Sequence, residues 1–424
     1  EEGSSRCWGH VMSAARLGSI VFAHDHLFYR AADGAWFARG GQYSAASWSR
    51  YLAEGEQLIV AARHAPLAPF EDRAQLSPSG CPGVSFVHVP SLAGVGKRFN
   101  QGRAARDTLL AALQKADLLI ARLPSQTGLL AIAMAQRLGK PWAVECVGCA
   151  WDAHVNHASL RAKLYAPIAR RQMRAAIAQA PVVSYVTERF LQQRYATNGV
   201  SVACSDVEIA MAAPAEVLDA RRRRIQSLGD GRPVRFGLIG SFAHQHKGID
   251  IALQALHTAQ RQLPSFELHV LGPGDPSAMM RLASRLGLGD WFKPYAPLPK
   301  GPAVQSWFDE VDVYLQPSRY EALPRALIEA MARACPALAS DVGGIAELLP
   351  AAQLHAPGDH QRLAAQLIEA SDPNWQVQQA SCSVETARRF DAQVLAEKRA
   401  RFWLAVRDLV QGAPQPKVAA AAAP

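Results

Sequence analysis

The chain has 424 residues, of which 49% are hydrophobic and 19% charged, and its formal net charge is +9. This length suits two domains of ordinary size rather than one, and the composition is that of a folded globular protein. No apolar run approaches the roughly 18 residues of a membrane-spanning helix. The basic charge balance favours anionic partners but does not choose between nucleic acid, lipid and diphosphates.

The first residues and the cysteines predict a cytoplasmic protein. Residues 1–13 lack the basic flank and apolar run of an export signal. The seven cysteines are an odd number, and only Cys146 and Cys149 approach a metal or redox spacing. Because no second pair accompanies these two, we expect structural thiols rather than a zinc or redox site.

In the first half of the chain, short apolar runs alternate with segments of helical periodicity, which predicts a parallel sheet with helices between its strands. We expect strands at 19–23, 57–61, 84–89, 117–121, 141–146 and 182–186, and helices at 103–114 and 129–138.

The regular alternation stops near residue 205, and polar, basic residues run on to Pro233. The densest charge, Arg221–Arg224, is interpreted as a solvated linker or helix face, because it lacks the interleaved aromatic residues of a nucleic-acid surface. We place the domain boundary here. The N-terminal domain is expected at 15–215 and the C-terminal domain at 216–382.

The second half of the chain has the clearest βαβα pattern, which predicts a second parallel sheet covered by helices on both faces. We expect strands at 234–239, 266–271, 291–295, 312–316 and 336–340, and helices at 248–263, 279–286, 304–311, 324–334, 345–349 and 363–370. A helical segment within 383–411 is expected to return to the first domain, and the Ala/Pro-rich tail, 412–424, to be disordered.

Ligands of open parallel sheets bind beyond the carboxyl ends of the strands, so the loops there hold the candidate residues. After the strand at 312–316, Pro324 opens a helix whose free backbone N–H groups suit a diphosphate. Glu321 precedes this helix and Glu329 lies within it, where carboxylates would accept hydrogen bonds from sugar hydroxyls. The alternative is that Glu321 caps the helix and Glu329 is solvated.

Two other loops follow strands in the same half. Gly240 allows a close backbone turn, and Lys247 at a helix start would place a positive charge on a phosphate, although surface exposure is the more common explanation for a single lysine. Gly272 and Gly274 would let a flat base approach the backbone, although a plain turn is as economical an explanation.

In combination, these elements resemble family 4 glycosyltransferases of the GT-B fold. The resemblance spans residues 234–372 and rests on a Gly-rich turn, a Lys-Gly pair, a Gly-x-Gly turn, two glutamates separated by seven residues, and a Gly-Gly turn. These appear as Gly240-Ser241-Phe242, Lys247-Gly248, Gly272-Pro273-Gly274, Glu321 with Glu329, and Gly343-Gly344.

The resemblance implies an α/β protein of two Rossmann-like domains facing a central cleft, which transfers a sugar with retention of anomeric configuration. It assigns the donor diphosphate to Lys247, the transferred sugar to Glu321 and the ribose to Glu329. It makes Glu321 and Lys247 the catalytic residues. The donor-binding set is Gly240, Ser241, Lys247, Gly272, Gly274, Glu321, Leu323, Pro324, Arg325 and Glu329.

Three positions depart from the family pattern, and one of them is Ala322, which stands where the motif usually has a glycine and should narrow the loop. Ser241 stands where the family often has an arginine, and Arg319 or Arg325 could supply the missing charge. Val147 stands where the family often has a histidine that contacts the donor sugar. Asp152, His154 and His157 are the nearest candidates for that contact.

The first half resembles transferases of bacterial surface-polysaccharide assembly more loosely. His24 and Asp25 are expected to end the first strand and position the acceptor, or else to make local capping contacts. Gly40 and Gly41 stand where the family has a glycine turn over the donor phosphates, with Tyr43 and Trp48 opening the next helix. The residues expected to line the acceptor side or the cleft are His24, Asp25, Gly40, Gly41 and Asp152.

We therefore expect a nucleotide-sugar donor and a saccharide or lipid-linked acceptor, with no metal, because no clustered pair of aspartates suits one. A peripheral contact with the cytoplasmic membrane face is expected through Lys97, Arg98, Phe99 and Arg103, or else these form an ordinary solvated segment. A sugar-nucleotide epimerase and a non-catalytic nucleotide-sugar-binding subunit remain as alternatives. No nucleic-acid partner is expected.

Overall fold

The structure, a computed structural model, describes residues 16–39, 43–68, 71, 73, 76–92, 95–156, 159–209, 211, 213–299 and 301–412. They divide into two compact units. The first covers the chain as far as Val144 and resumes at Trp403, and the second runs from Glu145 to Phe402. No helix among these residues is long and apolar enough to cross a membrane. The domain boundary near residue 215 stays a prediction.

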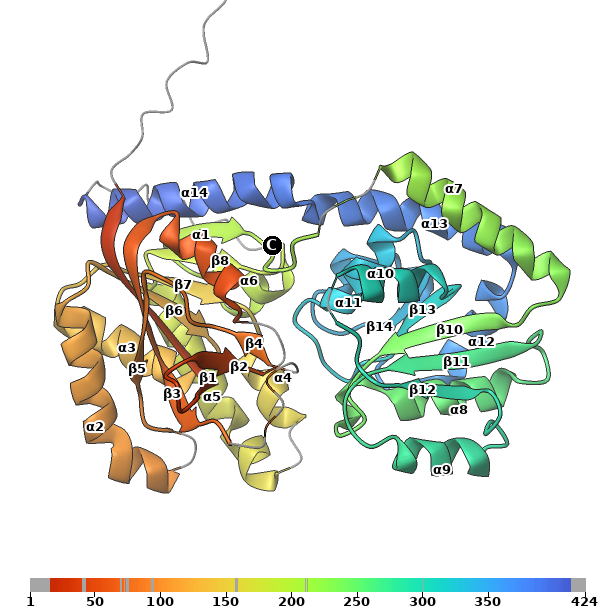
Figure 1. Cartoon of the computed structure of the whole chain (residues 1–424), viewed down its shortest axis with the longest axis horizontal. Coiled ribbons are helices and arrows are strands. Elements are labelled where there is room, and N and C mark those ends of the chain that lie inside the picture. The colour runs from red at the N-terminus through yellow and green to blue at the C-terminus, as the bar shows by residue number, and fades with distance from the viewer. Residues whose placement is uncertain are drawn as a thin grey trace, which may run out of the picture. The chain divides into compact units, whose positions relative to one another are not determined.

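A nine-stranded sheet has the order β4-β2-β1-β6-β7-β8-β9, with β3 and β5 extending from β1 (Figure 1). The division between the two units falls inside β7. Its strands are β1 (Leu17–Arg30), β2 (Trp36–Ala38), β3 (Gly55–Pro66), β4 (Ser77–Pro78), β5 (Val84–His88), β6 (Leu118–Leu123), β7 (Trp142–Cys146), β8 (Val182–Tyr185) and β9 (Val200–Ala203). The helices between them are η1 (Ala45–Trp48), α1 (Ser49–Leu52), α2 (Val95–Gln114), α3 (Gln126–Arg137), α4 (Ala150–Val155), α5 (Leu160–Gln179) and α6 (Phe190–Arg194).

The first strand does not end at His24 and Asp25, as the sequence had suggested. Its pairing with β3 shifts between Ala23 and Leu27, and the strand then continues to Arg30. The extension pairs with β2 in antiparallel register, and β2 pairs likewise with β4. The expected all-parallel first sheet therefore carries an antiparallel edge, because the chain turns back on itself after Arg30.

The second sheet lies wholly in the second unit and is parallel throughout, with the order β12-β11-β10-β13-β14-β15. Its strands are β10 (Val234–Ile239), β11 (Phe266–Leu271), β12 (Phe292–Tyr295), β13 (Val313–Gln316), β14 (Ala337–Ser340) and β15 (Leu354–His355). The helices are α8 (Ile249–Ala259), α9 (Ser277–Arg285), α10 (Pro302–Asp309), α11 (Arg325–Ala332) and α12 (His360–Ala370), with 3-10 turns η3 (Ser227–Asp230), η4 (Gln245–Lys247), η5 (Ile345–Glu347) and η6 (Ala351–Gln353).

Both faces of this sheet are buried, as the prediction of a doubly covered sheet requires. Val313 and Leu315 pack in one core cluster with α8, α9 and α12, whereas Tyr314 packs in another with α10 and α11. Alternate residues of one strand thus serve opposite cores, because successive side chains point to opposite faces. The strand order is that of a dinucleotide-binding Rossmann sheet, and the strand connections diverge between β10 and β13.

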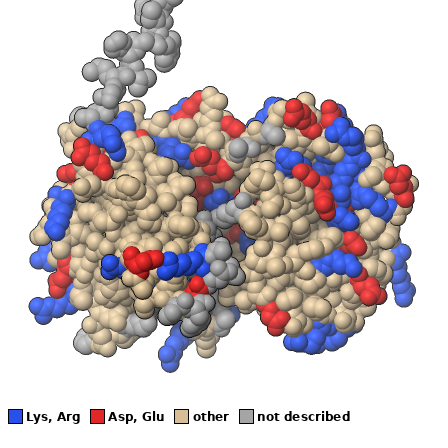
Figure 2. All heavy atoms as spheres, viewed as in Figure 1, with Lys and Arg blue, Asp and Glu red and all other residues tan. Residues whose placement is uncertain are grey.

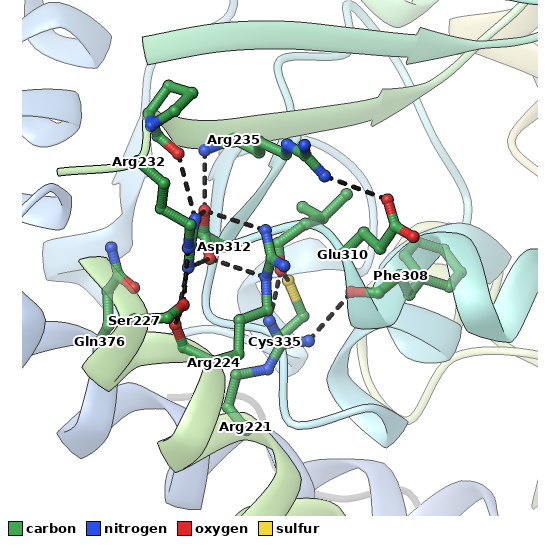
Figure 3. A network of polar contacts seen from close by, with 12 residues as sticks. Arg221, Arg224, Ser227, Arg232, Arg235, Phe308, Glu310, Asp312, Cys335 and Gln376 are labelled. Atoms are coloured by element: carbon green, nitrogen blue, oxygen red, sulfur yellow. Dashed lines mark hydrogen bonds and ion pairs between the residues drawn. The ribbon is translucent and has the colours of Figure 1, made fainter. Parts of the chain in front are cut away.

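The basic stretch interpreted as a solvated linker or face is the helix α7 (Pro214–Gln226). Lys and Arg side chains gather over this helix in Figure 2, yet Arg221 is only 2% exposed. Its guanidinium donates to the carbonyl of Phe308, near the end of α10 (Figure 3). It also donates to the carbonyls of Val311 and Arg333, which follow α10 and α11. The solvated interpretation is therefore wrong for Arg221.

A buried carboxylate completes this network. Asp312, which is fully buried, pairs with the guanidinium groups of Arg224 and Arg232 at 2.9 and 2.7 Å and accepts the backbone N–H of Arg235 (Figure 3). Arg224 is likewise not solvated as expected. The network fixes α7 against the amino-terminal edge of the second sheet, opposite the edge at which ligands bind.

The expected C-terminal helix is interrupted. α13 (Pro373–Ala387) is followed by the 3-10 turn η7 (Arg388–Phe390) and then by α14 (Ala392–Val410). The break places Asp391 in a bridge with Ile209. From Trp403 onward, α14 belongs to the first unit, where Trp403 packs edge-on against Tyr51. Residues 413–424 of the predicted tail lie outside the described part.

Candidate functional site

The carboxyl ends of β10 and β13 adjoin in the second unit, where the strand order reverses (Figure 1). The loop after β10 leads through η4 to α8, and the loop after β13 leads to α11. In Rossmann sheets this crevice is the usual ligand position. The expected donor residues of these loops therefore meet at the place where the fold favours a ligand.

Two predicted glycines are required by backbone contacts at this edge. A Cβ atom added to Gly272 would lie 2.0 Å from the carbonyl oxygen of Gly240. Gly248 has φ +70°, and a Cβ there would lie 2.0 Å from the carbonyl oxygen of Pro317. Only glycine fits such close backbone approaches, so these residues fix how the loops after β10, β11 and β13 pack together.

Glu321 is held by a polar cluster. Its Oε1 accepts from Nζ of Lys247 at 2.5 Å, from Oγ of Ser318 at 2.8 Å and from Nε2 of Gln316 at 3.0 Å. The Lys247 and Glu321 side chains are 19% and 11% exposed, so the ion pair is largely shielded from water. The two predicted catalytic residues, 74 positions apart, are thus in direct contact.

Tyr314 extends this cluster to the end of β10. Its hydroxyl donates to Oε1 of Gln316 at 2.9 Å and accepts from the backbone N–H of Ile239 at 3.4 Å. Complete burial raises the pKa of Tyr314 well above its usual value, and the carboxylates of Glu321 and Glu329 add to the rise. Sequence reasoning missed Tyr314, Gln316 and Ser318, although polar residues at the end of an apolar strand were a signal.

α11 begins beside this cluster. Its N-cap, Pro324, is buried and makes no capping hydrogen bond through its side chain. The hydrogen bonds of the Glu321 carboxylate go to Lys247, Gln316 and Ser318 instead of to the backbone of the helix. The capping alternative is thereby removed. Glu329 lies one turn inside α11 and is half-buried rather than fully solvated. The helix N-terminus, with its partial positive charge, faces the same edge of the sheet.

Arg319 and Arg325, the two candidates for the positive charge missing at Ser241, make different contacts in the structure. Arg319 pairs with both carboxylate oxygens of Asp250, at 3.0 and 2.7 Å, and so ties the loop after β13 to α8. Arg325 is exposed at the start of α11 and makes a 3.4 Å contact with the carbonyl of Asp206. The hydroxyl of Ser241 instead donates to the carbonyl of Pro273 at 3.3 Å.

The loop after β14 connects this cluster to α6. The N–H of Gly344 donates to the carbonyl of Ala322 at 2.7 Å. Three residues on, the Glu347 carboxylate accepts the backbone N–H groups of Glu188, Arg189 and Phe190 at 2.7–2.9 Å. Glu347 therefore holds the first turn of α6, a role that sequence reasoning missed although Glu347 follows the quoted Gly-Gly turn.

Comparison with known proteins identifies the class. Residues 233–372 match the family model described as Glycosyl transferases group 1. This part of the chain is similar to group 1 glycosyltransferases, which supports a glycosyl transfer activity. Protein CapJ of Staphylococcus aureus is 25% identical over 341 residues, which cover 80% of this chain and 83% of that protein. The amylovoran biosynthesis glycosyltransferase AmsK of Erwinia amylovora is 32% identical over 181 residues, or 38% of this chain and 44% of AmsK.

A solved structure shows the fold of this glycosyltransferase. Anabaena HepE in complex with UDP-glucose superposes with a TM-score of 0.61 at 16% identity, covering 91% of this chain and 99% of that one. The predicted α/β fold with two Rossmann-like domains, GT-B, is confirmed.

In the first unit of the glycosyltransferase, Asp25 caps a helix. Its carboxylate accepts the backbone N–H groups of Gln126 and Thr127 at 2.6 and 3.0 Å and the hydroxyl of Thr127 at 2.6 Å. His24 contacts the hydroxyl of Tyr43 through Nδ1 at 3.2 Å. These are the local contacts considered as the alternative, and an acceptor role for either residue stays a prediction. Gly40 and Gly41 lie outside the described residues.

The residues considered for the role of the missing histidine lie in the second unit. Asp152 pairs with Arg194 of α6 at 2.9 Å. His154 contacts the carbonyl of Ala150 through Nδ1 at 2.8 Å, and His157 lies outside the described part. Cys149, beside them, accepts the N–H of Asp152 as N-cap of α4, which agrees with a structural thiol.

Proposed function

We propose that this glycosyltransferase moves a sugar from a nucleotide diphosphate sugar to a saccharide or lipid-linked saccharide acceptor, with retention of anomeric configuration. The observation that carries the proposal is the convergence of Lys247, Glu321 and the N-terminus of α11 at the switch point of the second sheet. Two relatives support it: HepE was solved with UDP-glucose, and AmsK is named for amylovoran biosynthesis.

In this proposal, Glu321 and Glu329 hold the donor, whereas Lys247 and the N-terminus of α11 assist the departure of its diphosphate. The anomeric carbon loses its bond to the diphosphate, which leaves with the electron pair, while the acceptor oxygen bonds to the same face and its proton passes to the departing phosphate. Lys247 and the amides of α11 stabilise the charge that develops. Glu321 accepts hydrogen bonds from the transferred sugar, and Glu329 from the ribose.

Arg325 is the better substitute for the arginine missing at Ser241. Arg319 already uses its guanidinium on Asp250, whereas Arg325 is exposed at the amino end of α11. A guanidinium there would add a second cation to the diphosphate beside Lys247.

The reaction needs no metal ion in this proposal, because the lysine and the helix terminus supply the positive charge. Activity that survives EDTA would agree with this, and loss of activity restored by a divalent ion would contradict it.

We also propose that the protein works at the cytoplasmic membrane face, where a lipid-linked acceptor would be found.

The test measures donor binding and turnover together. A panel of nucleotide sugars that includes UDP-glucose is screened by thermal shift, since a bound donor raises the melting temperature by mass action. Glu321→Ala and Glu329→Ala should each abolish the turnover with the best donor, the rise in melting temperature that this donor causes, or both. Glu369→Ala, an exposed residue of α12, is the control. Unchanged turnover in both site variants would overturn the assignment.

A further inference from the structure

Helix α5 (Leu160–Gln179) has two apolar faces instead of one. Its buried residues, Ala166, Ala169, Met173 and Ile177, pack toward the interior at helical intervals. On the outside, Leu160, Leu164 and Ile168 are 70%, 71% and 52% exposed. Leu160 and Leu164 are the most exposed large apolar side chains in the part of the chain that the structure describes.

The exposed residues form a single stripe. Their spacing of four residues places them on one side of the helix, roughly opposite the buried side. A surface helix of a globular protein normally has a polar outer face, and a contiguous apolar patch there marks a binding surface.

The charged residues of α5 itself are all basic. Five exposed basic residues belong to α5, and its twenty residues include no Asp or Glu. Helical spacing puts Lys163, Arg170 and Arg174 along one border of the stripe and Arg161 on the other. The fifth, Arg171, lies between these borders. An apolar stripe bordered by basic residues is the pattern of helices that lie in the interface of anionic membranes.

We propose that the outer face of α5 docks on an anionic phospholipid surface, with Leu160, Leu164 and Ile168 inserted among the lipids and the basic residues on the headgroups. A second copy of the chain is a poor occupant, because it would bring five positive charges against five. The proposal adds a docking surface to the membrane location proposed above, and it rests on the proposed function, because a lipid-linked acceptor would explain why the enzyme docks. The binding of the chain to lipid can be measured without catalysis.

This surface differs from the one suggested by the sequence. Lys97, Arg98 and Phe99 fall in α2, but their side chains lie outside the described residues, and Arg103 is exposed on that helix. The α5 stripe could not be predicted from the sequence, because its two leucines and its isoleucine would suit a buried helix equally well. Only their exposure in the structure reveals the second apolar face.

The experiment is co-sedimentation of the full chain with vesicles of phosphatidylcholine alone or mixed with phosphatidylglycerol. The chain should bind the mixed vesicles and lose binding as salt rises. The pairs Leu164→Ser with Ile168→Ser, and Arg170→Gln with Arg174→Gln, should each lower the partition coefficient by roughly tenfold or more.

Matched controls carry the same chemical changes elsewhere. Leu404→Ser alters an exposed leucine of α14, and Arg222→Gln with Arg223→Gln removes two exposed charges from α7. Both controls should bind like the parent chain. Equal binding by the α5 variants, or equal binding to neutral vesicles, would overturn the proposal, as would a concentration-dependent dimer that the α5 variants abolish.

The donor thermal shift separates this proposal from the proposed function. The α5 variants should keep the full shift with the best nucleotide sugar, because α5 takes no part in the donor cluster. A chain that binds vesicles but no donor would refute the function alone, and a chain that binds donor but no vesicles would refute the docking alone.

Discussion

Gly272 is the residue at which one added methyl group has the most predictable effect. Because its Cβ would meet the backbone of Gly240 at 2.0 Å, Gly272→Ala should lower the free energy of unfolding by roughly 3 kcal/mol or more. Urea denaturation measures the change. Gly229→Ala, where no atom lies within 4 Å of the new Cβ, should change stability little. A Gly272 variant as stable as the Gly229 control would refute the contact.

Lys247 is expected to act on turnover rather than on folding. Lys247→Gln removes the charge that the proposal places on the departing diphosphate, so kcat should fall roughly 100-fold or more, as when a transition-state donor is removed. Steady-state kinetics with the best donor measure this. If kcat stayed unchanged and only KM rose, Lys247 would bind the donor without assisting departure.

At the scale of residues, the sequence predicted candidate site residues but not the contacts between them. Lys247 and Glu321 were both predicted from their positions after strands. Their ion pair, and the support of Glu321 by Gln316 and Ser318, depend on how separate loops fold back on one edge of the sheet. Spacing along the chain carries no information about that register.

Among the elements, α7 depends on a buried charge. Arg221→Ala would remove the guanidinium donor from the buried carbonyls of Phe308 and Val311 and from the partly buried carbonyl of Arg333, and the free energy of unfolding should fall by roughly 3 kcal/mol. Asp312→Asn should destabilise similarly, because the charges of Arg224 and Arg232 lose their partner. Arg222→Ala, an exposed change on the same helix, should be nearly neutral. Equal melting of all three variants would contradict the network.

The second sheet was predictable and α7 was not, for physical reasons. Strands buried on both faces give continuous apolar runs, so β10, β11, β13 and β14 fell within a residue of their expected limits. In α7 a charged residue, Arg221, occupies a core-facing position, which hides the amphipathic pattern. The short strands β2 and β4 have too few residues to show any alternation.

The stability of the molecule should fall in mild acid because of two half-buried histidines in the first unit, His26 and His64. Burial, together with a nearby charge, lowers the pKa of His26 and of His64 from 6.5 to about 4. Between pH 6.5 and 4 these two histidines are therefore protonated in the unfolded chain but remain neutral in the folded chain. The stability that the protein has above pH 6.5 is lost as the pH falls toward 4.

Urea denaturation across this range tests the effect. His26→Gln and His64→Gln should each make the free energy of unfolding less dependent on pH between 6.5 and 4 than it is in the parent chain. A parent chain with no loss in this window, or variants with the parent's slope, would show that these side chains take up protons in the folded state.

The backbone contacts of Gly248 and Gly272 set a boundary for redesign. Where two backbone segments touch, no side chain can be exchanged to widen or reshape the crevice, so substitutions at those positions would yield destabilised clones in a mutant library. Diversity would have to enter through Ser241, Ala322 and Arg325, which border the same crevice and carry side chains. Altered donor preference, if selection finds it, should map to these neighbours while both glycines remain unchanged.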